Sequence, residues 1–145
     1  MNQAVRQKLS GFAILAAILA ESVAFAALAP EFLSFENLVN IALSIAVIGI
    51  LAVGMTFVIL TGGIDLSIGS VVALAGVAAA LVTQRTEIAW LGFAAALGIG
   101  LACGAFNGSL VAFFRVPPFV VTLAVLTIAR GLAFILSEGR SVGNL

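Results

Sequence analysis

Apolar positions along this chain gather into five long runs that are separated by short polar breaks. The runs cover about residues 9–29, 38–60, 66–82, 88–114 and 116–136. At about 1.5 Å per residue, the second run is about 34 Å long and crosses a hydrocarbon core of roughly 30 Å as a helix. The third, at about 26 Å, is slightly short, so the break before it can lie somewhat inside the membrane. The pattern predicts an all-α, polytopic integral membrane protein: one transmembrane domain over residues 1–145, with about five spanning helices.

The composition agrees with a membrane protein and excludes several other classes. Hydrophobic residues make up 63% of the sequence and charged residues only 8%, and the mean hydropathy is +1.33. Soluble domains carry roughly a quarter charged residues, so this chain has too few to cover a surface that faces water. Six basic residues balance six acidic ones, and this gross charge gives no indication of nucleic-acid binding. Histidine is absent and the single cysteine, Cys103, lies in an apolar run, so the sequence predicts no metal site, no internal disulfide and no cofactor.

The basic residues predict the orientation of the chain in the membrane. With the N-terminus inside, three basic residues outside the apolar runs are cytoplasmic and two are external: Arg6, Lys8 and Arg115 against Arg85 and Arg140. The acidic loop with Glu31 and Glu36 favours the same orientation, which places the N-terminus in the cytoplasm. The first run ends on Ala27-Leu28-Ala29, which also matches a signal-peptidase site, but the membrane segments that follow favour an uncleaved first helix.

One polar break holds a carboxylate where hydrocarbon or its edge is expected. The break reads Thr61-Gly62-Gly63-Ile64-Asp65-Leu66-Ser67, and Asp65 is the only charged residue between Asn37 and Gln84. An ionised Asp at the centre of a spanning helix costs about 2.5–3.5 kcal/mol on insertion scales. Such a residue persists because the turn reaches water or because a site uses the charge.

The residue types in this break predict a tight turn between two helices. Gly62 or Gly63 can close the second helix in a left-handed conformation without a Cβ penalty. Asp65 can then cap the third helix by accepting hydrogen bonds from the backbone N–H groups of Ser67 or Ile68. The functional interpretation is that a helix broken inside the membrane presents backbone dipoles and a carboxylate to a polar solute. The structural and the functional interpretations are compatible, and both stay open.

The fourth run carries small residues at every fourth position, which gives one smooth helix face. They are Gly92, Ala96, Gly100, Gly104 and Gly108. Small residues at this spacing let two backbones approach closely in lipid, where packing drives helix association. The pattern therefore predicts tight helix–helix packing. A second interpretation, that the face lets helices slide during a transport cycle, is not separated from the first by sequence.

Several segments of the chain together resemble one known family. The core is the seventeen-residue segment GMTFVILTGGIDLSIGS, Gly54–Ser70. Further matching blocks are Pro30–Ser34, Asn37–Asn40, Gly104–Gly108, Arg115–Leu123, Thr127–Gly131 and Gly139–Arg140. The set resembles ABC-transporter permeases that import monosaccharides of the ribose, xylose, arabinose and galactoside type. The likeness covers nearly all of the chain from Pro30 onward.

The chain departs from that family in length. Permeases of the family are longer and carry a second set of helices, together with the cytoplasmic coupling helix that docks the ATP-binding subunit. The resemblance therefore indicates the N-terminal half of a permease, either a fragment or a truncated gene product. Such a piece is not expected to couple ATP hydrolysis to transport by itself.

The resemblance also implies a function and a set of partners. A permease of this family performs no covalent chemistry and is not an enzyme; it forms the path by which a monosaccharide crosses the bacterial inner membrane. Two permease copies would form the pore as a homodimer, cytoplasmic ATP-binding subunits would drive it, and a periplasmic sugar-binding protein would deliver the substrate. The lipid bilayer is the remaining partner.

The candidate residues of the translocation path are polar side chains within the apolar runs, together with one aromatic. They are Asp65, Ser67, Asn107, Thr122, Thr61 and Phe119. Asn107 and Thr122, like Asp65, also have structural interpretations. Asn107 could make an interhelical hydrogen bond, which contributes on the order of 0.6 kcal/mol in a membrane. Thr122 could bond to a carbonyl of its own helix, and Pro117-Pro118 sets the start of the fifth helix.

Other functional classes stay open on the residues alone. An ion-coupled secondary transporter would also show broken helices and membrane carboxylates. A channel would require rings of like residues, and the sequence shows no such filter. A membrane enzyme would require a nucleophile with a base or a metal, which this composition disfavours. A non-functional truncated fragment or a helical scaffold is the structural alternative, and the sequence does not name the sugar.

Overall fold

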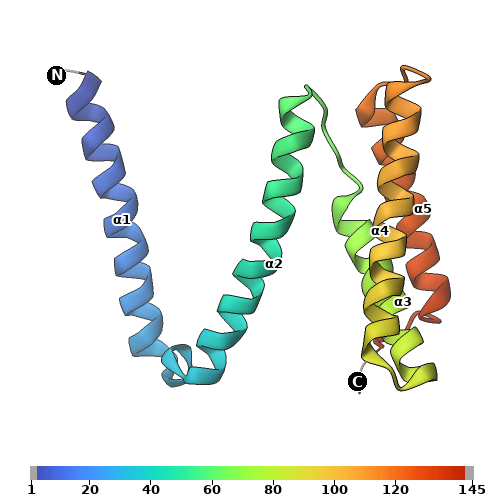
Figure 1. Ribbon diagram of the computed structural model, residues 1–145. Coiled ribbons are helices and arrows are strands. Elements are labelled where there is room, and N and C mark those ends of the chain that lie inside the picture. The colour runs from blue at the N-terminus through green and yellow to red at the C-terminus, as the bar shows by residue number, and fades with distance from the viewer. Residues whose placement is uncertain (1–2, 143–145) are drawn as a thin grey trace. The chain divides into compact units, whose positions relative to one another are not determined.

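The computed structural model describes residues 3–142 of the chain, with side chains from residue 12 onward (Figure 1). The described residues form five α-helices and one 3-10 helix, without a strand. These elements are α1 (Gln3–Leu28), η1 (Pro30–Leu33), α2 (Phe35–Leu60), α3 (Ile68–Thr86), α4 (Ala89–Ala112) and α5 (Pro118–Leu136). The all-α fold predicted from the sequence is confirmed.

Four of the described helices, α2 to α5, are long and apolar enough to cross a membrane. Their ends lie within four residues of the ends predicted from the apolar runs, because the turns that bound them contain glycine, proline or charged residues. The described apolar part of α1, Phe12–Leu28, is shorter than these four. The first of the five predicted spans therefore stays a prediction.

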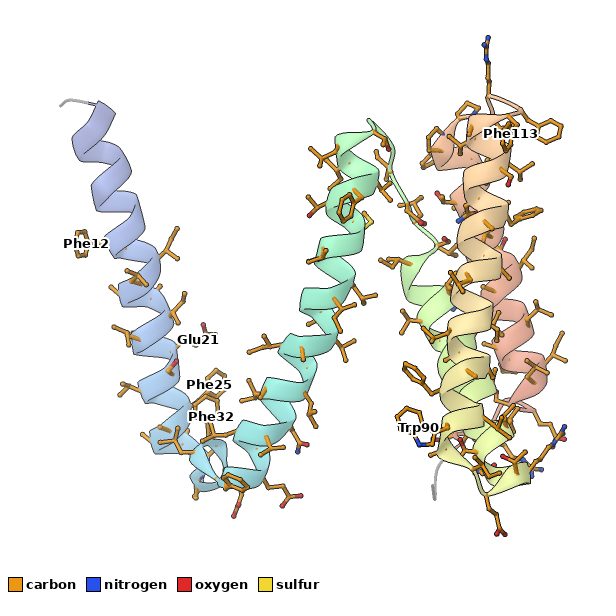
Figure 2. All side chains as sticks on the ribbon, viewed as in Figure 1. Phe12, Glu21, Phe25, Phe32, Trp90 and Phe113 are labelled. Atoms are coloured by element: carbon orange, nitrogen blue, oxygen red, sulfur yellow. The ribbon has the colours of Figure 1, made fainter. Side chains whose placement is uncertain are left out.

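Residues 1–50 and residues 51–145 form two separate compact units, and α2 runs through both. In the first unit, Ser34 begins α2 as a capping residue: its Oγ accepts a hydrogen bond from the backbone N–H of Asn37 at 3.2 Å. The Asn37 side chain donates to the carbonyl of Phe32 at 2.7 Å. The ring of Phe32 stacks on Phe25 of α1, with 5.7 Å between ring centroids (Figure 2). These contacts fix the corner between α1 and α2.

The second unit is a bundle of α3, α4 and α5, in which α4 runs antiparallel to the other two (Figure 1). The α3 and α4 helices approach closely at Gly92. A Cβ added there would lie 2.6 Å from the carbonyl oxygen of Ala79 on α3, so only glycine fits. The buried residues of α5 recur at four-residue spacing, namely Val121, Val125, Ala129 and Ala133. Two of these, Ala129 and Ala133, form a core with Leu74 of α3.

Large apolar side chains cover the outside of the helices. Examples of their exposed fractions are 80% for Trp90, 74% for Leu101 and 68% for Phe134. In water such a surface would aggregate, whereas in a bilayer it meets lipid tails. Together with the four long apolar helices, this surface makes the chain a multi-pass membrane protein.

Candidate functional site at the broken helix

The α2 helix ends at a glycine in the left-handed conformation, as the sequence predicts. Gly62 has a φ of +77°. Its N–H donates to the carbonyl of Ile59 at 2.9 Å, and the N–H of Gly63 donates to the carbonyl of Val58 at 3.0 Å. These two bonds define a Schellman motif, which satisfies carbonyls that the helix end would otherwise leave unpaired. The chain thereby leaves α2 in a fixed direction.

The connection from α2 to α3 is longer than the predicted tight turn. The segment Gly63–Ser67 is not helical, and α3 begins at Ile68, two residues later than expected. Ser67 contacts Asn107, which lies about 7.5 Å before the end of α4 at Ala112. The non-helical segment therefore lies beside α4 and inside the bundle's depth, so α2 and α3 form a discontinuous pair of helices. Non-helical backbone at membrane depth is tolerated where protein surrounds it or it lines a cavity.

Asp65 bends this segment onto the first turn of α3. Its Oδ1 accepts a hydrogen bond from the backbone N–H of Ser67 at 2.7 Å and another from the Ser67 hydroxyl at 2.6 Å. The predicted bond from Ser67 N–H to Asp65 is confirmed, but the prediction that Asp65 caps the helix is wrong: the N-cap of α3 is Ser67, two residues later, because the helix starts at Ile68, and no side chain makes the capping bond. The carboxylate also lies at the positive end of the α3 dipole, which favours a negative charge there. Ser67 is 1% exposed and Asp65 is half-buried, so this contact is partly shielded from its surroundings.

Asn107 of α4 extends the same chain of hydrogen bonds. Its Nδ2 donates to the Ser67 hydroxyl oxygen at 3.1 Å, across the boundary between α4 and the broken segment. A carboxylate only accepts, so the one hydroxyl hydrogen of Ser67 goes to Asp65 and the amide nitrogen of Asn107 must face Ser67. The other end of the amide, Oδ1, is then left buried without a hydrogen-bond partner among the described residues. Leaving a buried acceptor unpaired costs about 1–3 kcal/mol.

Thr122 ties the segment to the third helix of the bundle. Its hydroxyl donates to the carbonyl of Ile64 at 3.2 Å and lies 3.4 Å from the carbonyl of Phe119 in its own helix. The second contact is the local bond expected from the sequence, while the first joins α5 to the break. The non-helical segment is thus held from both sides, by α4 through Asn107 and by α5 through Thr122.

A cavity of about 250 Å³ adjoins this cluster. The residues that line it are Val58, Thr61, Gly63, Ile64, Asp65, Gly104, Asn107, Gly108, Val111, Pro118 and Thr122. Four of the six predicted path residues are among them. Ser67 lies behind the wall and acts through Asp65 and Asn107. The side chain of Phe119 is 53% exposed and is not part of the described lining.

The five small residues of α4 divide into different environments. Gly92 packs against α3, as described above, and Ala96 is half-buried. Gly100, Gly104 and Gly108 have open space where a Cβ would be, and the last two line the cavity. Close helix packing along the whole face stays a prediction, because among its four glycines only Gly92 has a close neighbour in the described structure.

Sequence reasoning did not find three contributors to this site. The carbonyl of Ile64, which accepts from Thr122, is a backbone group and carries no residue-type signal. Val58 and Pro118 form the apolar wall, and in the sequence they look like ordinary span residues. The available signal was the spacing of Asn107, three residues after Gly104 and four before Val111, because residues so spaced lie along one side of a helix.

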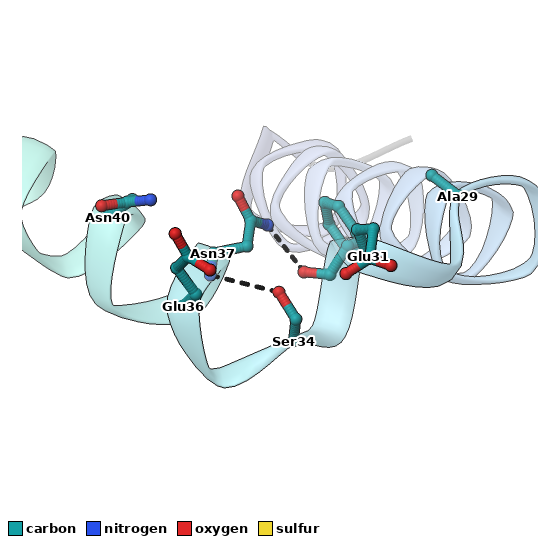
Figure 3. A pocket seen from close by; sticks show the side chains of 7 residues that line it. Ala29, Glu31, Ser34, Glu36, Asn37 and Asn40 are labelled. Atoms are coloured by element: carbon teal, nitrogen blue, oxygen red, sulfur yellow. Dashed lines mark hydrogen bonds between the residues drawn. The ribbon is translucent and has the colours of Figure 1, made fainter.

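A second hollow, of about 470 Å³, lies at the corner of the first unit (Figure 3). Glu31, Glu36, Asn37 and Asn40 are among its lining residues. The hydrogen bonds of Asn37 in this hollow serve the corner itself, and both carboxylates are exposed. Among the described residues, no three His, Cys, Asp or Glu side chains come together as they would in a metal site.

Fold and site together define a polytopic helical membrane protein with a discontinuous helix pair and a buried polar cluster at the discontinuity. Comparison with known proteins assigns it to a family. Residues 37–144 match the family described as "Branched-chain amino acid transport system / permease component". This range includes the whole site. The chain belongs to this permease family.

The relatives found include sugar permeases. The chain is 41% identical over 121 residues to the L-arabinose transport system permease protein AraH of Escherichia coli, which covers 83% of this chain and 37% of the relative. It is 44% identical over 117 residues to the ribose import permease protein RbsC of the same species. That match covers 81% of this chain and 36% of the relative. The inner membrane ABC transporter permease protein YjfF of Escherichia coli is 46% identical to it over 110 residues. That match covers 75% of this chain and 33% of the relative. The chain thus spans little more than a third of the length of these curated relatives, and no solved structure matches it.

Proposed function

We propose that this chain is the N-terminal part of the permease subunit of a binding-protein-dependent ABC importer, which carries a monosaccharide across the bacterial inner membrane. The observation that carries the proposal is the match itself. It extends over residues 37–144 and therefore includes the broken helix, Asn107 and Thr122. The relatives named for L-arabinose and ribose transport supply the substrate class.

The proposal includes partners that the chain does not contain. A second permease copy completes the pore, ATP-binding subunits act on the cytoplasmic face, and a periplasmic sugar-binding protein delivers the substrate. The chain itself performs no catalysis. The N-terminus faces the cytoplasm, in agreement with the distribution of basic residues.

The polar cluster serves as part of the translocation path. Asp65, Asn107, Thr122 and Thr61 contribute the polar groups of its wall, and Ser67 positions two of them. Phe119, at the start of α5, is proposed at the edge of the path. Such a sparse polar wall fits weak solute contacts. A permease supplied by a binding protein needs no high affinity of its own, because a ligand shifts an alternating-access equilibrium only through its different affinities for the two states.

The test is uptake of radiolabelled D-ribose and L-arabinose by a bacterial strain that lacks its own pentose transporters. The native-length protein is expressed together with an ATP-binding subunit and a periplasmic binding protein of the same importer type. We expect uptake of one of the sugars that requires all three components. A matched strain with the P-loop lysine of the ATP-binding subunit replaced by alanine should lose this uptake, because that lysine holds the transferred phosphate.

The same experiment distinguishes the proposed ABC importer from an ion-coupled secondary transporter. A secondary transporter with a discontinuous helix takes its energy from a proton or sodium gradient. Its uptake would persist with the inactive ATP-binding subunit and would follow the imposed ion gradient. That result would overturn the proposed function.

A further inference from the structure

The α5 helix carries a charged side chain well inside its length. Arg130 lies twelve residues after the start of α5 at Pro118 and six before its end at Leu136. At about 1.5 Å per residue, its Cα is about 9 Å from the nearer end of a helix that is about 28 Å long. The side chain is exposed on the outside of the bundle. Because α5 is long and apolar enough to cross a membrane, this guanidinium lies at the depth of the hydrocarbon.

Arg130 has no partner within the described part of the chain, where its guanidinium makes no hydrogen bond and no ion pair. The carboxylates of the bundle lie at other depths. Asp65 lines the same cavity as Thr122, which precedes Arg130 by eight residues, or about 12 Å along α5. Glu87 and Glu138 lie in the turns beyond the ends of α3 and α5. A charge at membrane depth is costly against lipid tails, so Arg130 requires a partner from outside the bundle.

The direction of the side chain disfavours a lipid headgroup as that partner. In an α-helix the Cα–Cβ bond tilts toward the N-terminus of the helix. For Arg130 this direction runs toward Pro118 and away from the nearer end of α5. The side chain therefore leaves the backbone toward the middle of the membrane, where no headgroup lies.

The helix surface beside Arg130 is small and open. Thr127 and Gly131 are four residues apart on one side of α5, and Ala124 precedes them on the same side. The Thr127 hydroxyl donates to the carbonyl of Ala124 at 2.7 Å, so its own helix satisfies it. A Cβ added at Gly131 meets no atom within 4 Å. Small residues so spaced let a second helix approach closely in lipid.

We infer that this face of α5, formed by Ala124, Thr127, Arg130 and Gly131, is a docking surface for another membrane helix of the native-length permease, one that carries an Asp or Glu at the depth of Arg130. The inference rests on the proposed function, under which this chain is the N-terminal part of the permease. The match to the L-arabinose permease covers 37% of that relative, so most of such a protein lies beyond this chain.

Charge complementarity selects the carboxylate, because Arg and a carboxylate can form two parallel hydrogen bonds as well as an ion pair. A second copy of the bundle is a poorer source. Two copies with the same orientation in the membrane hold equivalent residues at equal depths, so the second Asp65, Glu87 and Glu138 lie no closer to the depth of Arg130.

The test compares variants of the native-length permease by their melting midpoint in a mild detergent, which requires no transport. We expect Arg130→Leu to lower the midpoint by about 5 °C or more, because the partner carboxylate is left uncompensated. Arg130→Lys keeps the charge and should lose less. Arg85→Leu, at the exposed last turn of α3, is the matched control and should change the midpoint little.

Charge exchange then identifies the partner. Arg130→Glu places two carboxylates against each other and should lower the midpoint further than Arg130→Leu. In this background each Asp or Glu in the spans beyond this chain is replaced by lysine, one at a time. We expect one lysine variant to restore at least about half of the lost midpoint, because it reverses the ion pair. Rescue by Glu21→Lys instead would assign the pair to α1 and overturn the docking of a further helix.

Gly131→Leu tests the same face without a change of charge, and it keeps the inference testable if the Arg130 variants fail to fold. Leucine is favoured over glycine within a helix, and the bundle leaves open space for its Cβ. Only a docked helix is crowded by it, so we expect the midpoint to fall. Gly98→Leu on α4 is the matched control: its Cβ also meets no atom within 4 Å, and its neighbours Leu97 and Leu101 are exposed. It should leave the midpoint unchanged or raise it.

Three results would overturn the docking surface. Arg130→Leu melts at or above the temperature of the unaltered protein, no lysine variant beyond this chain restores Arg130→Glu, or Gly131→Leu behaves like Gly98→Leu. Failure of the proposed function is separate. A rescued ion pair without ATP-dependent sugar uptake contradicts the importer and leaves the docking surface intact, whereas uptake with unaltered melting of the variants contradicts the docking surface alone.

Discussion

At the scale of single residues, the site depends on the direction of one chain of hydrogen bonds. Asn107 donates to Ser67, and Ser67 donates to Asp65, so each group has one fixed orientation. An isolated hydrogen bond between membrane helices contributes only about 0.6 kcal/mol on average. Ser67 is different because its hydroxyl joins the buried Asn107 to the half-buried Asp65. Its removal leaves the buried Nδ2 of Asn107 unpaired, whereas Asp65 keeps the bond from the backbone N–H of residue 67, and an unpaired buried donor costs more than one membrane hydrogen bond contributes.

Ser67→Ala should therefore destabilise the protein by about 1–3 kcal/mol, the cost of leaving buried polar groups unpaired. The measurement is the free energy of unfolding in a detergent titration. Ser44→Ala is the matched control, because the Ser44 hydroxyl is exposed and bonds only to the Asn40 carbonyl of its own helix. Its effect should stay within about 0.5 kcal/mol. Equal effects of the two substitutions would show that the chain of hydrogen bonds through Ser67 contributes nothing to the free energy of unfolding.

At the scale of elements, one glycine inside α2 and one just after its end should respond in opposite directions to alanine. Gly62 has the left-handed φ of +77°, which costs a side chain about 1–2 kcal/mol. Gly54 lies in the interior of α2, where alanine is favoured by up to about 1 kcal/mol. Neither position has an atom within 4 Å of an added Cβ, so crowding does not enter the comparison. Gly62→Ala should lower the free energy of unfolding and Gly54→Ala should raise it; the same sign for both would contradict the Schellman end.

A second pair of glycines tests the crossing between α3 and α4. Gly92→Ala should destabilise by about 1–3 kcal/mol, because its Cβ would overlap the side chain of Thr83 and the backbone of Ala79. Gly100→Ala lies on the same helix, and its Cβ meets nothing within 4 Å. It should be neutral or slightly stabilising in the same detergent titration. A large loss at Gly100 would instead mean that another helix covers this part of the small-residue face in the membrane.

Sequence and structure agree where the controlling interactions are local. The ends of α2, the left-handed Gly62 and the bond from Ser67 N–H to Asp65 all lie within a few residues and follow from residue type. The length of the non-helical segment did not follow. It depends on Asn107 and Thr122, which are 40 and 58 residues from their partners in the chain. Those contacts replace the helical bonds that Leu66 would otherwise make, and no local pattern encodes them.

At the scale of the whole molecule, the alternation of the helices supports the proposed orientation. In the bundle of α3, α4 and α5, the turn at Glu87 and the corner at Arg115 lie at opposite ends of α4 (Figure 1). Arg115 and the basic residues Arg6 and Lys8 fall on one side if α1 also crosses the membrane. The positive-inside rule predicts that this side faces the cytoplasm.

Reporter fusions test this orientation together with the predicted crossing of the membrane by α1. Alkaline phosphatase is active only outside the cytoplasm, so fusions after Glu31 and after Glu87 should be active and a fusion after Phe114 inactive. Green fluorescent protein at the same three points is the matched control and should give the reverse pattern. If α1 does not cross, the fusion after Glu31 falls on the cytoplasmic side and loses phosphatase activity, while the other two keep their pattern. Replacing Arg6 and Lys8 by glutamine should give a mixed orientation, because it removes the charges that hold the N-terminus inside. An unchanged pattern in that variant would assign the orientation to Arg115 and the later helices instead.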